Sequence, residues 1–415
     1  MTEWQVRRLG ELCNLRRDHV PPDRLKNEQY VAMEHLDSGR TSLQRWVVAD
    51  GVRSNKGRFR KGDILYGKLR PYLDKAVVAP FDGVCSTELL VLDPDADRVD
   101  PKFLCYLIHT AEFRAFAEAT TAGVNHPRTS WSSLAAFEAL IPPTAEQAAI
   151  ASVLDVVEAA IRTEELLFRS IDRLKSATMA KLFREGLRGE PLKQTEIGEI
   201  PESWEVVRLG DLCSRIDYGT SQRCSEEPTA HPVLRIPNII HGMIDTINLK
   251  YAEVGVLTER EIEKLRLVPG DLLFVRTNGN RQYTGRCAVY EGRPAGALFA
   301  SYLIRVRLPS GAVDPFFVQQ YLSEVGREQI TRRANPAADG KFNVDTGILR
   351  DLKIPRPSLS EQQEIVAVLA ALDERRRLAQ RCHASLERLF SSVLNALMTG
   401  AIRVKDLDLA EVSHA

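Results

Sequence analysis

The chain lacks the features that mark several protein classes. No apolar run approaches the roughly 18–20 residues of a membrane-spanning helix, and the opening residues have no apolar core of a signal peptide. The seven cysteines are scattered and form no C-x-x-C pair, which argues against a zinc site or a disulfide framework. Lys plus Arg and Asp plus Glu balance at 56 each, so the basic excess of a free-standing DNA-binding protein is missing. We expect a cytoplasmic protein of two or three domains.

Motifs of common catalytic chemistry are missing too. The sequence has no phosphate-binding G-x-x-x-x-G-K-[ST] loop, no H-E-x-x-H and no G-x-S-x-G. No glycine-rich turn follows a strand as a dinucleotide or methyl-donor pocket requires. Cys13 and Cys213 each follow an apolar leucine and are expected to be small core residues. We therefore expect neither catalytic residues nor a metal site in this chain.

The most informative feature is an internal repeat. The segment "WQVRRLGELC" (4–13) returns as "WEVVRLGDLC" (204–213), with seven of ten positions identical. Further matches follow in the same order, and their offset drifts from 200 to about 215 residues. The matching segments are 61–78 with 269–290, 99–108 with 313–322, and 140–155 with 353–370. A period near 200 is too long for a solenoid, so the chain is a duplicated two-part unit.

Each copy has a mixed front and a helical back. The fronts hold short apolar runs such as "DILYG" and "DLLFVR", which predict strands, with helices expected over 101–117 and 315–330. The backs, 144–185 and 359–399, contain no glycine or proline and predict one long helix each. The capping-box spacings that would start these helices are Thr144 with Gln147 and Ser360 with Gln363, and the glycines that would end them are Gly186 and Gly400.

Apolar residues recur every seven positions in both predicted helices. In the second helix one position holds Ile365, Leu372, Ala379, Leu386 and Val393, and the other holds Val368, Cys382, Leu389 and Ala396, interrupted by Arg375. The first helix has Ile150, Val157 and Ile171 alternating with Val153, Ala160, Leu167 and Leu174, interrupted by Glu164. A stripe this long must be buried, and we expect the two helices to bury each other as an antiparallel coiled coil. Separate packing of each helix on its own domain is the alternative.

Basic polar loops occupy matching places in the two copies. The first combines Lys68, Arg70, Tyr72 and Lys75, and the second combines Arg276, Asn278, Asn280, Arg281, Gln282 and Arg286. Arg can bond guanine edges in two places, Asn and Gln can bond adenine, and Lys and Arg anchor phosphates. Two reading heads joined by two rigid helices would suit a DNA target with two half-sites.

Taken together, these motifs resemble those of the specificity (S) subunit of type I restriction–modification systems. The resemblance covers nearly the whole length. It rests on the W-x-V-x-R-L-G-[ED]-L openings, on the Gly-Asp turns at 62–63 and 270–271, and above all on the "IPP…EQ" and "IPRP…EQQEIVAVL" segments before the helices. The order of parts implies an α+β fold with two target-recognition domains, 1–143 and 191–357. A central helical region, 144–190, would join them, and a distal helical region and tail, 358–415, would follow.

The resemblance also implies a function and partners. Each recognition domain would read half of a split DNA sequence, with the helices as spacer. Two methyltransferase (M) subunits would dock on the helices and bring S-adenosylmethionine, and restriction (R) subunits would bring ATP and Mg. The chain itself would be non-catalytic and carry no cofactor. The alternatives are a coiled-coil scaffold that binds only proteins and a self-contained DNA-modifying enzyme.

The resemblance suggests further DNA contacts outside the two basic loops. The segment "DYGTSQRC" (217–224) is similar to a polar segment after the opening strand in the family, which adds Thr220, Ser221 and Gln222. The segments 123–131 and 340–349 precede the last strand of each front and add Asn125, Arg128, Lys341 and Asn343. A purely structural turn is the alternative for these last two segments.

Overall fold

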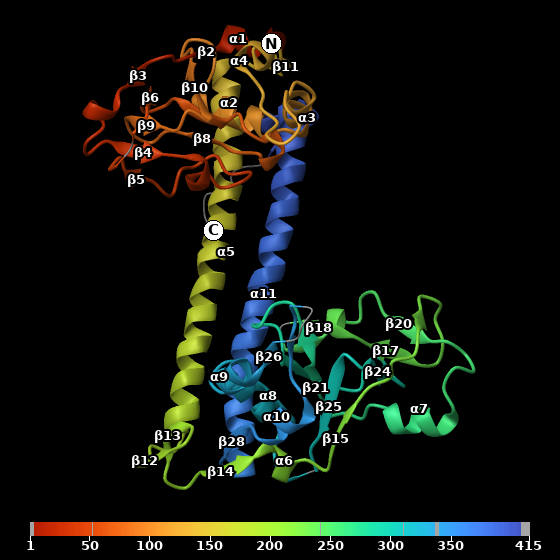
Figure 1. The fold of residues 1–415 in the computed structure, drawn as a ribbon. Coiled ribbons are helices and arrows are strands. Elements are labelled where there is room, and N and C mark those ends of the chain that lie inside the picture. The colour runs from red at the N-terminus through yellow and green to blue at the C-terminus, as the bar shows by residue number, and fades with distance from the viewer. Residues whose placement is uncertain (1–3, 52, 241, 310, 337–339, 408–415) are drawn as a thin grey trace. The chain divides into compact units, whose positions relative to one another are not determined.

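A computed structural model describes the chain except residues 1–3, 52, 241, 310, 337–339 and 408–415. It divides into two compact units: Met1–Leu166 with Gln380–Ala415 form unit 1, and Leu167–Ala379 form unit 2. The long helices α5 (Thr144–Glu185, yellow-green in Figure 1) and α11 (Leu359–Met398, blue) each contribute one part to each unit. Among the described residues, no helix is both long enough and apolar enough to cross a membrane.

Unit 1 contains two sheets and a strand pair. One sheet has the order β2 (Cys13–Leu15), β10 (Leu89–Pro94), β7 (Ile64–Gly67) and β8 (Ala76–Val78). The other has the order β3 (His19–Val20), β6 (Lys56–Phe59), β9 (Gly83–Cys85), β4 (Gln29–Val31) and β5 (Val47–Val48). The pair joins β1 (Gln5–Arg8) to β11 (Glu138–Ile141), and the short helices are α1 (Leu9–Leu12) and α4 (Trp131–Leu134).

Unit 2 repeats the first sheet and the strand pair of unit 1, whereas its second sheet differs in strand number and order. Its first sheet has the order β15 (Arg215–Tyr218), β25 (Leu303–Arg307), β21 (Leu272–Val275) and β23 (Cys287–Val289). Its second has the order β16 (Cys224–Ser225), β20 (Lys250–Ala252), β17 (Pro232–Leu234) and β24 (Leu298–Phe299). The pair of β14 (Glu205–Arg208) with β28 (Lys353–Arg356) matches β1 with β11, and the parallel pair β17–β24 matches β4–β9. The remaining elements include β12 (Leu192–Thr195), β13 (Gly198–Pro201), α6 (Leu209–Leu212), α7 (Glu259–Leu265) and α10 (Thr346–Arg350).

The helices expected over 101–117 and 315–330 are each broken in two. α2 (Pro101–Ile108) stops before Thr110, whose hydroxyl accepts a hydrogen bond from the third residue of α3 (Ala111–Ala119). α8 (Pro315–Ser323) and α9 (Arg327–Arg333) are separated at Gly326, where a Cβ would come within 2.5 Å of Tyr321. The "VDP" motif before α2 and α8 is explained by an aspartate N-cap followed by proline at N1.

The opening tryptophan of the repeat anchors the start of a long helix. In unit 1, Trp4 Nε1 donates to the Glu146 carboxylate at 3.1 Å, and Arg403 donates to both oxygens of that carboxylate at 2.6 Å. The ring of Trp4 also lies against Gly400, which has a φ of +72° and ends α11. One carboxylate thus joins the opening strand, the start of α5 and the segment after α11.

Unit 2 has the same junction. Trp204 Nε1 donates to Glu361 at 3.1 Å, and the other oxygen of Glu361 accepts from the Leu187 backbone N–H at 2.8 Å. Gly186, with a φ of +62°, ends α5 beside Trp204. The motif appears twice because each long helix begins where the other ends.

The capping boxes expected at the helix starts are not formed. Gln147 accepts from Asp100 N and donates to backbone carbonyls, so it holds the "VDP" turn instead of capping α5. Gln362 does the same in unit 2. The cap of α11 is Ser358, whose hydroxyl accepts from Glu361 N at 3.3 Å, two residues before the serine that the spacing suggested.

The heptad pattern is correct at one position and wrong at the other. In α11 the expected Ile365 and Ala379 are buried, and Leu372, Leu386 and Val393 are half-buried. The second position is exposed except at Ala396; its exposed residues are Val368, Arg375, Cys382 and Leu389. Leu167 and Leu174 of α5 are exposed as well.

The buried series lies one residue later. It comprises Leu369, Arg376, His383, Phe390 and Leu397 in α11, and Leu154, Ile161, Phe168, Lys175 and Leu182 in α5, all buried or half-buried. Charged residues occupy some of these positions, so the register predicted from apolar residues is displaced by one residue, onto adjacent exposed leucines. Arg375, which seemed to interrupt the stripe, lies outside it, whereas Glu164 is half-buried within it.

Candidate nucleic-acid interface

The Gly-Asp turns of the repeat position the strands that carry the basic loops. The glycine of each turn has a φ of +93°. Asp63 accepts from Arg60 N at 2.7 Å and pairs with Arg16. Asp271, fully buried, accepts from Val268 N and pairs with Arg307 at 2.6 Å. The motif thus fixes the start of β7 in unit 1 and of β21 in unit 2, and the candidate loops follow these strands.

In unit 1 the structure brings the loop after β7 next to the segment 123–131. Arg70 N donates to Pro127 O at 2.8 Å, and Thr129 N donates to Lys68 O at 3.1 Å. Arg70 has a φ of +52°, a left-handed conformation that is uncommon outside glycine and is associated with functional loops. The Arg70 side chain and Tyr72, which is 53% exposed, point to solvent.

Other candidate residues of unit 1 are already engaged. Lys75 Nζ donates to Met33 O at 2.7 Å. Arg128 makes two hydrogen bonds to Glu88, at 3.0 and 3.3 Å, which hold the pKa of that carboxyl below its usual range. Asn125 is exposed. Arg70, Tyr72 and Asn125 are therefore better placed than Lys75 and Arg128 to meet a ligand.

In unit 2 the loop 276–286 pairs with the segment 342–343. Strand β22 (Thr277–Asn278) pairs antiparallel with β27 (Phe342–Asn343), which also pairs with β26 (Asn335–Pro336). Arg276 N donates to Tyr302 O, and the Arg276 guanidinium donates to Ser301 O at 3.3 Å. Ser301 N donates to Thr220 O, so the 217–224 segment joins the same surface.

Three arginines of this loop lie against aromatic rings. The guanidinium carbon is 4.8 Å from the Tyr218 ring centroid for Arg276, 5.5 Å from Phe342 for Arg281, and 4.0 Å from Tyr283 for Arg286. Such contacts restrict the arginine and leave edge N–H groups for a ligand. Among the described residues, none of these three arginines forms an ion pair with a carboxylate.

The amide side chains of the loop partly shape it. The Asn278 side chain accepts from Asn280 N at 2.8 Å, and the Asn280 side chain accepts from Gln282 N at 2.9 Å. The hydroxyl of Thr220, which is 9% exposed, accepts from Gln222 N at 3.1 Å. These carbonyl and hydroxyl oxygens set turns and leave the amide NH2 groups as donors. Ser221, Gln222 and Lys341 are exposed, and Asn343 is half-buried.

Sequence reasoning missed three residues of this surface. The ring of Tyr218 lies against Arg276, and Tyr302, 59% exposed, accepts a hydrogen bond from Arg276 N through its backbone carbonyl. Arg327 donates to Gln282 O at 2.9 Å and to Thr284 O, so it holds the loop from below, and burial lowers its pKa. Tyr218 lay within a segment already singled out, whereas no pattern in the sequence marks Tyr302 or Arg327.

Cys13 lies in the core as expected, whereas Cys213 is only partly buried at the edge of the core of unit 2. Cys13 is 1% exposed, and burial raises its pKa to about 12. Burial also raises the pKa of Cys213, which is half-buried. A nucleophilic cysteine needs the opposite shift.

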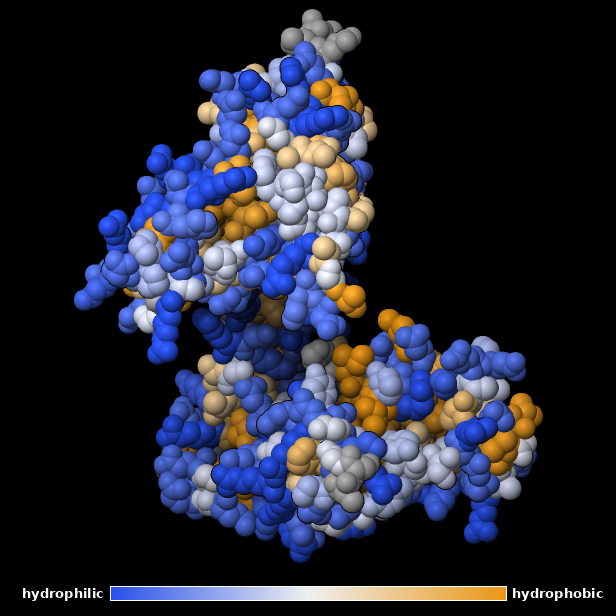
Figure 2. Space-filling view, turned by 45° about the horizontal axis from the view of Figure 1, so that its top comes forward, coloured by the Kyte–Doolittle hydropathy of each residue, from blue (hydrophilic) through white to orange (hydrophobic). Residues whose placement is uncertain are grey.

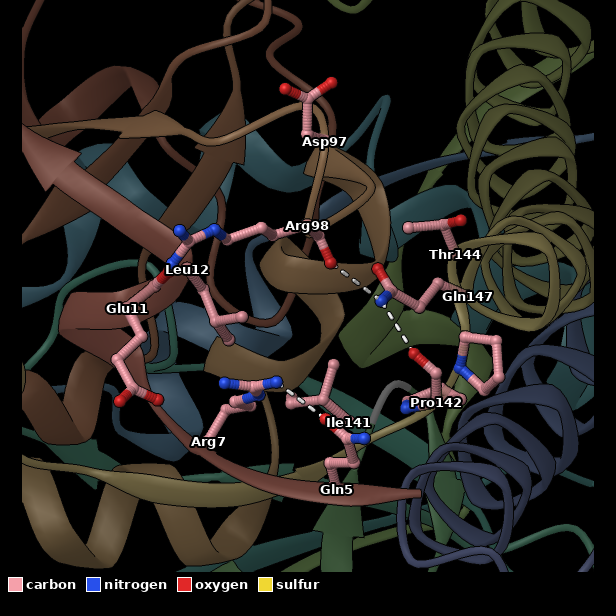
Figure 3. A pocket seen from close by; sticks show the side chains of 11 residues that line it. Gln5, Arg7, Glu11, Leu12, Asp97, Arg98, Ile141, Pro142, Thr144 and Gln147 are labelled. Carbon is pink, nitrogen blue, oxygen red and sulfur yellow. Dashed lines mark hydrogen bonds between the residues drawn. The ribbon is translucent and has the colours of Figure 1, made fainter. Parts of the chain in front are cut away.

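A hollow of about 440 Å3 in unit 1 contains none of the candidate DNA contacts. It lies at the start of α5, and its wall includes Arg7, Glu11, Arg98 and Gln147 (Figure 3). The Gln147 amide that borders it is held by the Arg98 and Pro142 carbonyls. The polar groups here serve the junction of strand and helix.

Comparison with known families gives one match. A model described as "Type I restriction modification DNA specificity domain" matches residues 1–169 and again 201–388. The putative MjaX specificity subunit of Methanocaldococcus jannaschii is 33% identical over 184 residues, which cover 44% of this chain and 43% of that protein. The MjaVIII specificity subunit of the same organism is 25% identical, covering 98% of this chain and 94% of that one. The Escherichia coli EcoKI specificity subunit is 23% identical, covering 72% and 65%.

Solved structures share the fold. A type I restriction–modification S subunit from M. genitalium matches with a TM-score of 0.59 and 17% identity, covering 95% of this chain and 96% of that chain. A chain from work on complex assembly and conformational transition of the type I R-M system matches with a TM-score of 0.57 and 19% identity, covering 97% and 99%.

Proposed function

This chain belongs to the family of type I restriction–modification DNA specificity subunits, and we propose that each of its units reads one half of a bipartite DNA target. The observation that carries this proposal is the equivalence of two loops, which follow β7 and β21 behind the same Gly-Asp turn. Each loop is packed against the segment before the last strand of its unit and presents cations and aromatic rings. Basic loops of this composition can contact both phosphates and base edges.

Residue roles in the proposal follow the geometry. Arg276 and Arg281 would bond guanine, because their guanidinium groups are oriented by aromatic rings and have no acidic partner among the described residues. Arg70 and Tyr72 would be the corresponding contacts of unit 1. Lys75 and Arg128 would be weaker contacts, because both already bond within the protein. The remaining proposed contacts are Lys68, Asn125, Thr220, Ser221, Gln222, Asn278, Asn280, Gln282, Arg286, Lys341 and Asn343.

The helices would set the distance between the half-sites as an antiparallel coiled coil. Within unit 1, Ile150 and Leu154 of α5 share a core with Leu394 and Leu397 of α11. Within unit 2, Lys175 pairs with Asp373, and Asp172 with Arg376. These opposite orders along the two helices support the proposal. In domain terms, 1–143 and 191–357 would recognise DNA, and 144–190 and 358–415 would form the spacer.

Partner subunits would cover the outer faces of the helices. Several large apolar side chains of these helices are exposed. Figure 2 shows one face of the molecule, on which hydrophilic residues predominate and apolar residues lie in small patches. The exposed residues are Val156, Leu166, Leu167, Leu174, Val368, Leu378 and Leu389. Exposed apolar side chains that gather into one patch are typical of interaction sites, and these residues are the candidates for such a patch. We propose that two M subunits dock here and supply S-adenosylmethionine, that R subunits join with ATP and Mg, and that the complex is cytoplasmic with this chain non-catalytic.

The test is a map of methylated adenines by long-read sequencing. Cells carrying this gene and its neighbouring methyltransferase gene are compared with cells lacking this gene alone. Loss of one bipartite motif on deletion is the expected result. An unchanged map, together with failure of the chain to capture methyltransferase subunits in a pull-down, would refute the proposal.

The methylation map, together with DNA binding by the complex and activity of the purified chain, distinguishes the alternative functions. A protein-only scaffold predicts that Arg276→Ala with Arg281→Ala leaves the methylated motif and DNA affinity of the assembled complex unchanged. A self-contained enzyme predicts that the purified chain modifies or cuts DNA without partners. We expect the double variant to lose the half-site read by unit 2 and the purified chain to be inactive.

A further inference from the structure

A turn of the recognition region in unit 1 reaches both long helices. The guanidinium of Arg40 donates to Glu165 of α5 at 3.0 Å and to Glu387 of α11. Its side chain is 17% exposed, so the two ion pairs are partly shielded from solvent. Glu165, His383 and Glu387 could by themselves offer three metal ligands within 4.8 Å of one another. Arg40 already supplies the positive charge there, so we interpret the two carboxylates as partners of this arginine and not as a metal site.

The next residues of the turn bind a buried carboxylate. Glu158 of α5, 3% exposed, accepts from Thr41 N at 3.2 Å, from the Thr41 hydroxyl at 2.5 Å and from the Ser42 hydroxyl at 3.2 Å. Tyr106 of α2 donates to the same carboxylate at 3.0 Å. Together with the Arg40 pairs, these bonds fasten the turn to the helices; we call residues 38–42 the clasp.

The clasp also holds the candidate reading loop. Ser38 donates through its hydroxyl to Leu73 O at 2.7 Å, and Gly39 N donates to Asp74 O at 2.8 Å. Leu73 and Asp74 directly follow the exposed Tyr72. A short series of hydrogen bonds therefore runs from Glu165 and Glu387 through the clasp to the loop proposed to meet DNA.

The described residues of unit 2 make no contact that matches the clasp. The segment of unit 2 that corresponds to the clasp follows the 3-10 turn Ile236–Asn238, which is equivalent to Met33–His35 of unit 1. This segment includes Gly242, which has a φ of +79°. There β18 (Ile239–Ile240) and β19 (Met243–Ile244) form a hairpin, and Met243 replaces the arginine. Met243 is 44% exposed and lines a groove of about 770 Å3 between this hairpin, α8 and the helices. Arg376 of α11 pairs with Asp172 instead, which leaves the hairpin without a charged link to the helices among the described contacts.

We propose that Arg40 is a positioning residue that fixes the reading loop of unit 1 on the spacer helices and thereby restricts the spacer length that the complex accepts. The inference rests on the proposed function. A one-base-pair change in spacer moves and rotates a half-site, so only a head that can shift on its helices would follow it. A rigidly held head rejects the wrong spacing without any contact to the spacer bases.

The experiment is the methylation map of the assembled complex with Arg40→Gln, which removes the charge and keeps much of the side chain. We expect sites with a spacer one base pair shorter or longer to gain methylation about tenfold, as loss of one charge-assisted hydrogen bond allows. The bases of both half-sites should be unchanged. Arg45→Gln is the matched control, because Arg45 lies in the same segment but pairs with Asp37 and not with a helix.

A second variant separates loss of folding from loss of positioning. Glu387→Gln weakens the same contact from the helix side and should relax spacing in the same way, even where Arg40→Gln abolishes methylation altogether. A single unchanged spacer length in Glu387→Gln, or altered half-site bases in Arg40→Gln, would overturn the inference. Absence of any bipartite motif with the unaltered chain would instead refute the proposed function.

Discussion

The two units share their first sheet and the junction of strand and helix, but differ in how the candidate recognition region is attached to the helices. In unit 1 the clasp binds Glu158, Glu165 and Glu387. In unit 2 the equivalent hairpin lines an open groove at Met243. The candidate reading loops also differ. In unit 2 three arginines lie on aromatic rings, whereas in unit 1 Arg128 is paired with Glu88.

The two copies show which contacts of the duplicated unit are constrained in sequence and which are free to change. Contacts that build the scaffold are kept in both copies, as in the bonds from Trp4 to Glu146 and from Trp204 to Glu361. Contacts made by loops have diverged, because loops carry binding function and tolerate insertions. The differences between the units should therefore appear as different responses to equivalent substitutions.

The largest difference is expected at the Gly-Asp turns. Asp271→Asn removes a fully buried carboxylate that makes two charged hydrogen bonds to Arg307, at 2.6 and 2.7 Å, and should lower the free energy of unfolding of unit 2 by about 3 kcal/mol. Asp63→Asn in unit 1 should cost less, because Arg16 keeps Asp93 at 2.9 Å. Hydrogen exchange of peptides from each unit in urea measures both losses. Equal losses of unfolding free energy in the two units would contradict this predicted difference.

The second difference concerns carboxylates at equivalent places on the helices. Glu158→Ala removes the acceptor of four donors and should destabilise unit 1 by about 2–3 kcal/mol. Asp373→Ala in unit 2, which loses Lys175 and Gln320, should cost only about 1 kcal/mol because that site borders the open groove. The same exchange experiment applies, and a larger loss for Asp373→Ala would contradict the description of the clasp.

A smaller difference is expected in DNA binding. Arg281→Ala should weaken binding of the assembled complex by about 1–3 kcal/mol and relax one base position. Arg128→Ala should change affinity little, because Glu88 already holds that guanidinium. Titration of labelled target and single-base variants measures both. If Arg128→Ala is the more harmful substitution, the assignment of reading residues is reversed.

The smallest effect is a pH dependence in unit 1. The hydrogen bonds from Arg403 hold the pKa of Glu146 below its usual range. A carboxyl with a lowered folded-state pKa stabilises the fold above its unfolded pKa, near 4.3, and this stability is lost as pH falls through the folded-state pKa. Glu146→Gln should cost about 1 kcal/mol at pH 7 and flatten the fall in stability below pH 4. Urea midpoints across that pH range provide the measurement.

The sequence predicted the repeated architecture well, because its signals are local. Trp, Gly-Asp and "EQ" return in order, and both long helices follow from segments free of glycine and proline. The heptad register failed at one position because Arg376, His383 and Lys175 occupy half-buried positions while Leu167 and Leu389 are exposed. The sequence does not show which residue will pair with a half-buried charged side chain.

The candidate interface was only partly predictable. The loops 66–75 and 276–286 stand out by composition, but pairing of β22 with β27 joins residues more than sixty positions apart. The clasp was missed for the same reason, since Arg40 meets Glu387 across 347 positions. Contacts between distant segments leave no periodic pattern, so the roles of Arg40 and Arg327 follow only from the fold.

The most direct test of the two-head account is a domain exchange. Residues 1–143 are replaced by the corresponding region of another specificity subunit, and the methylated motif of the complex is mapped by long-read sequencing. The account predicts that one half of the motif changes while the other half remains as before. A change in both halves, or in neither, would contradict it.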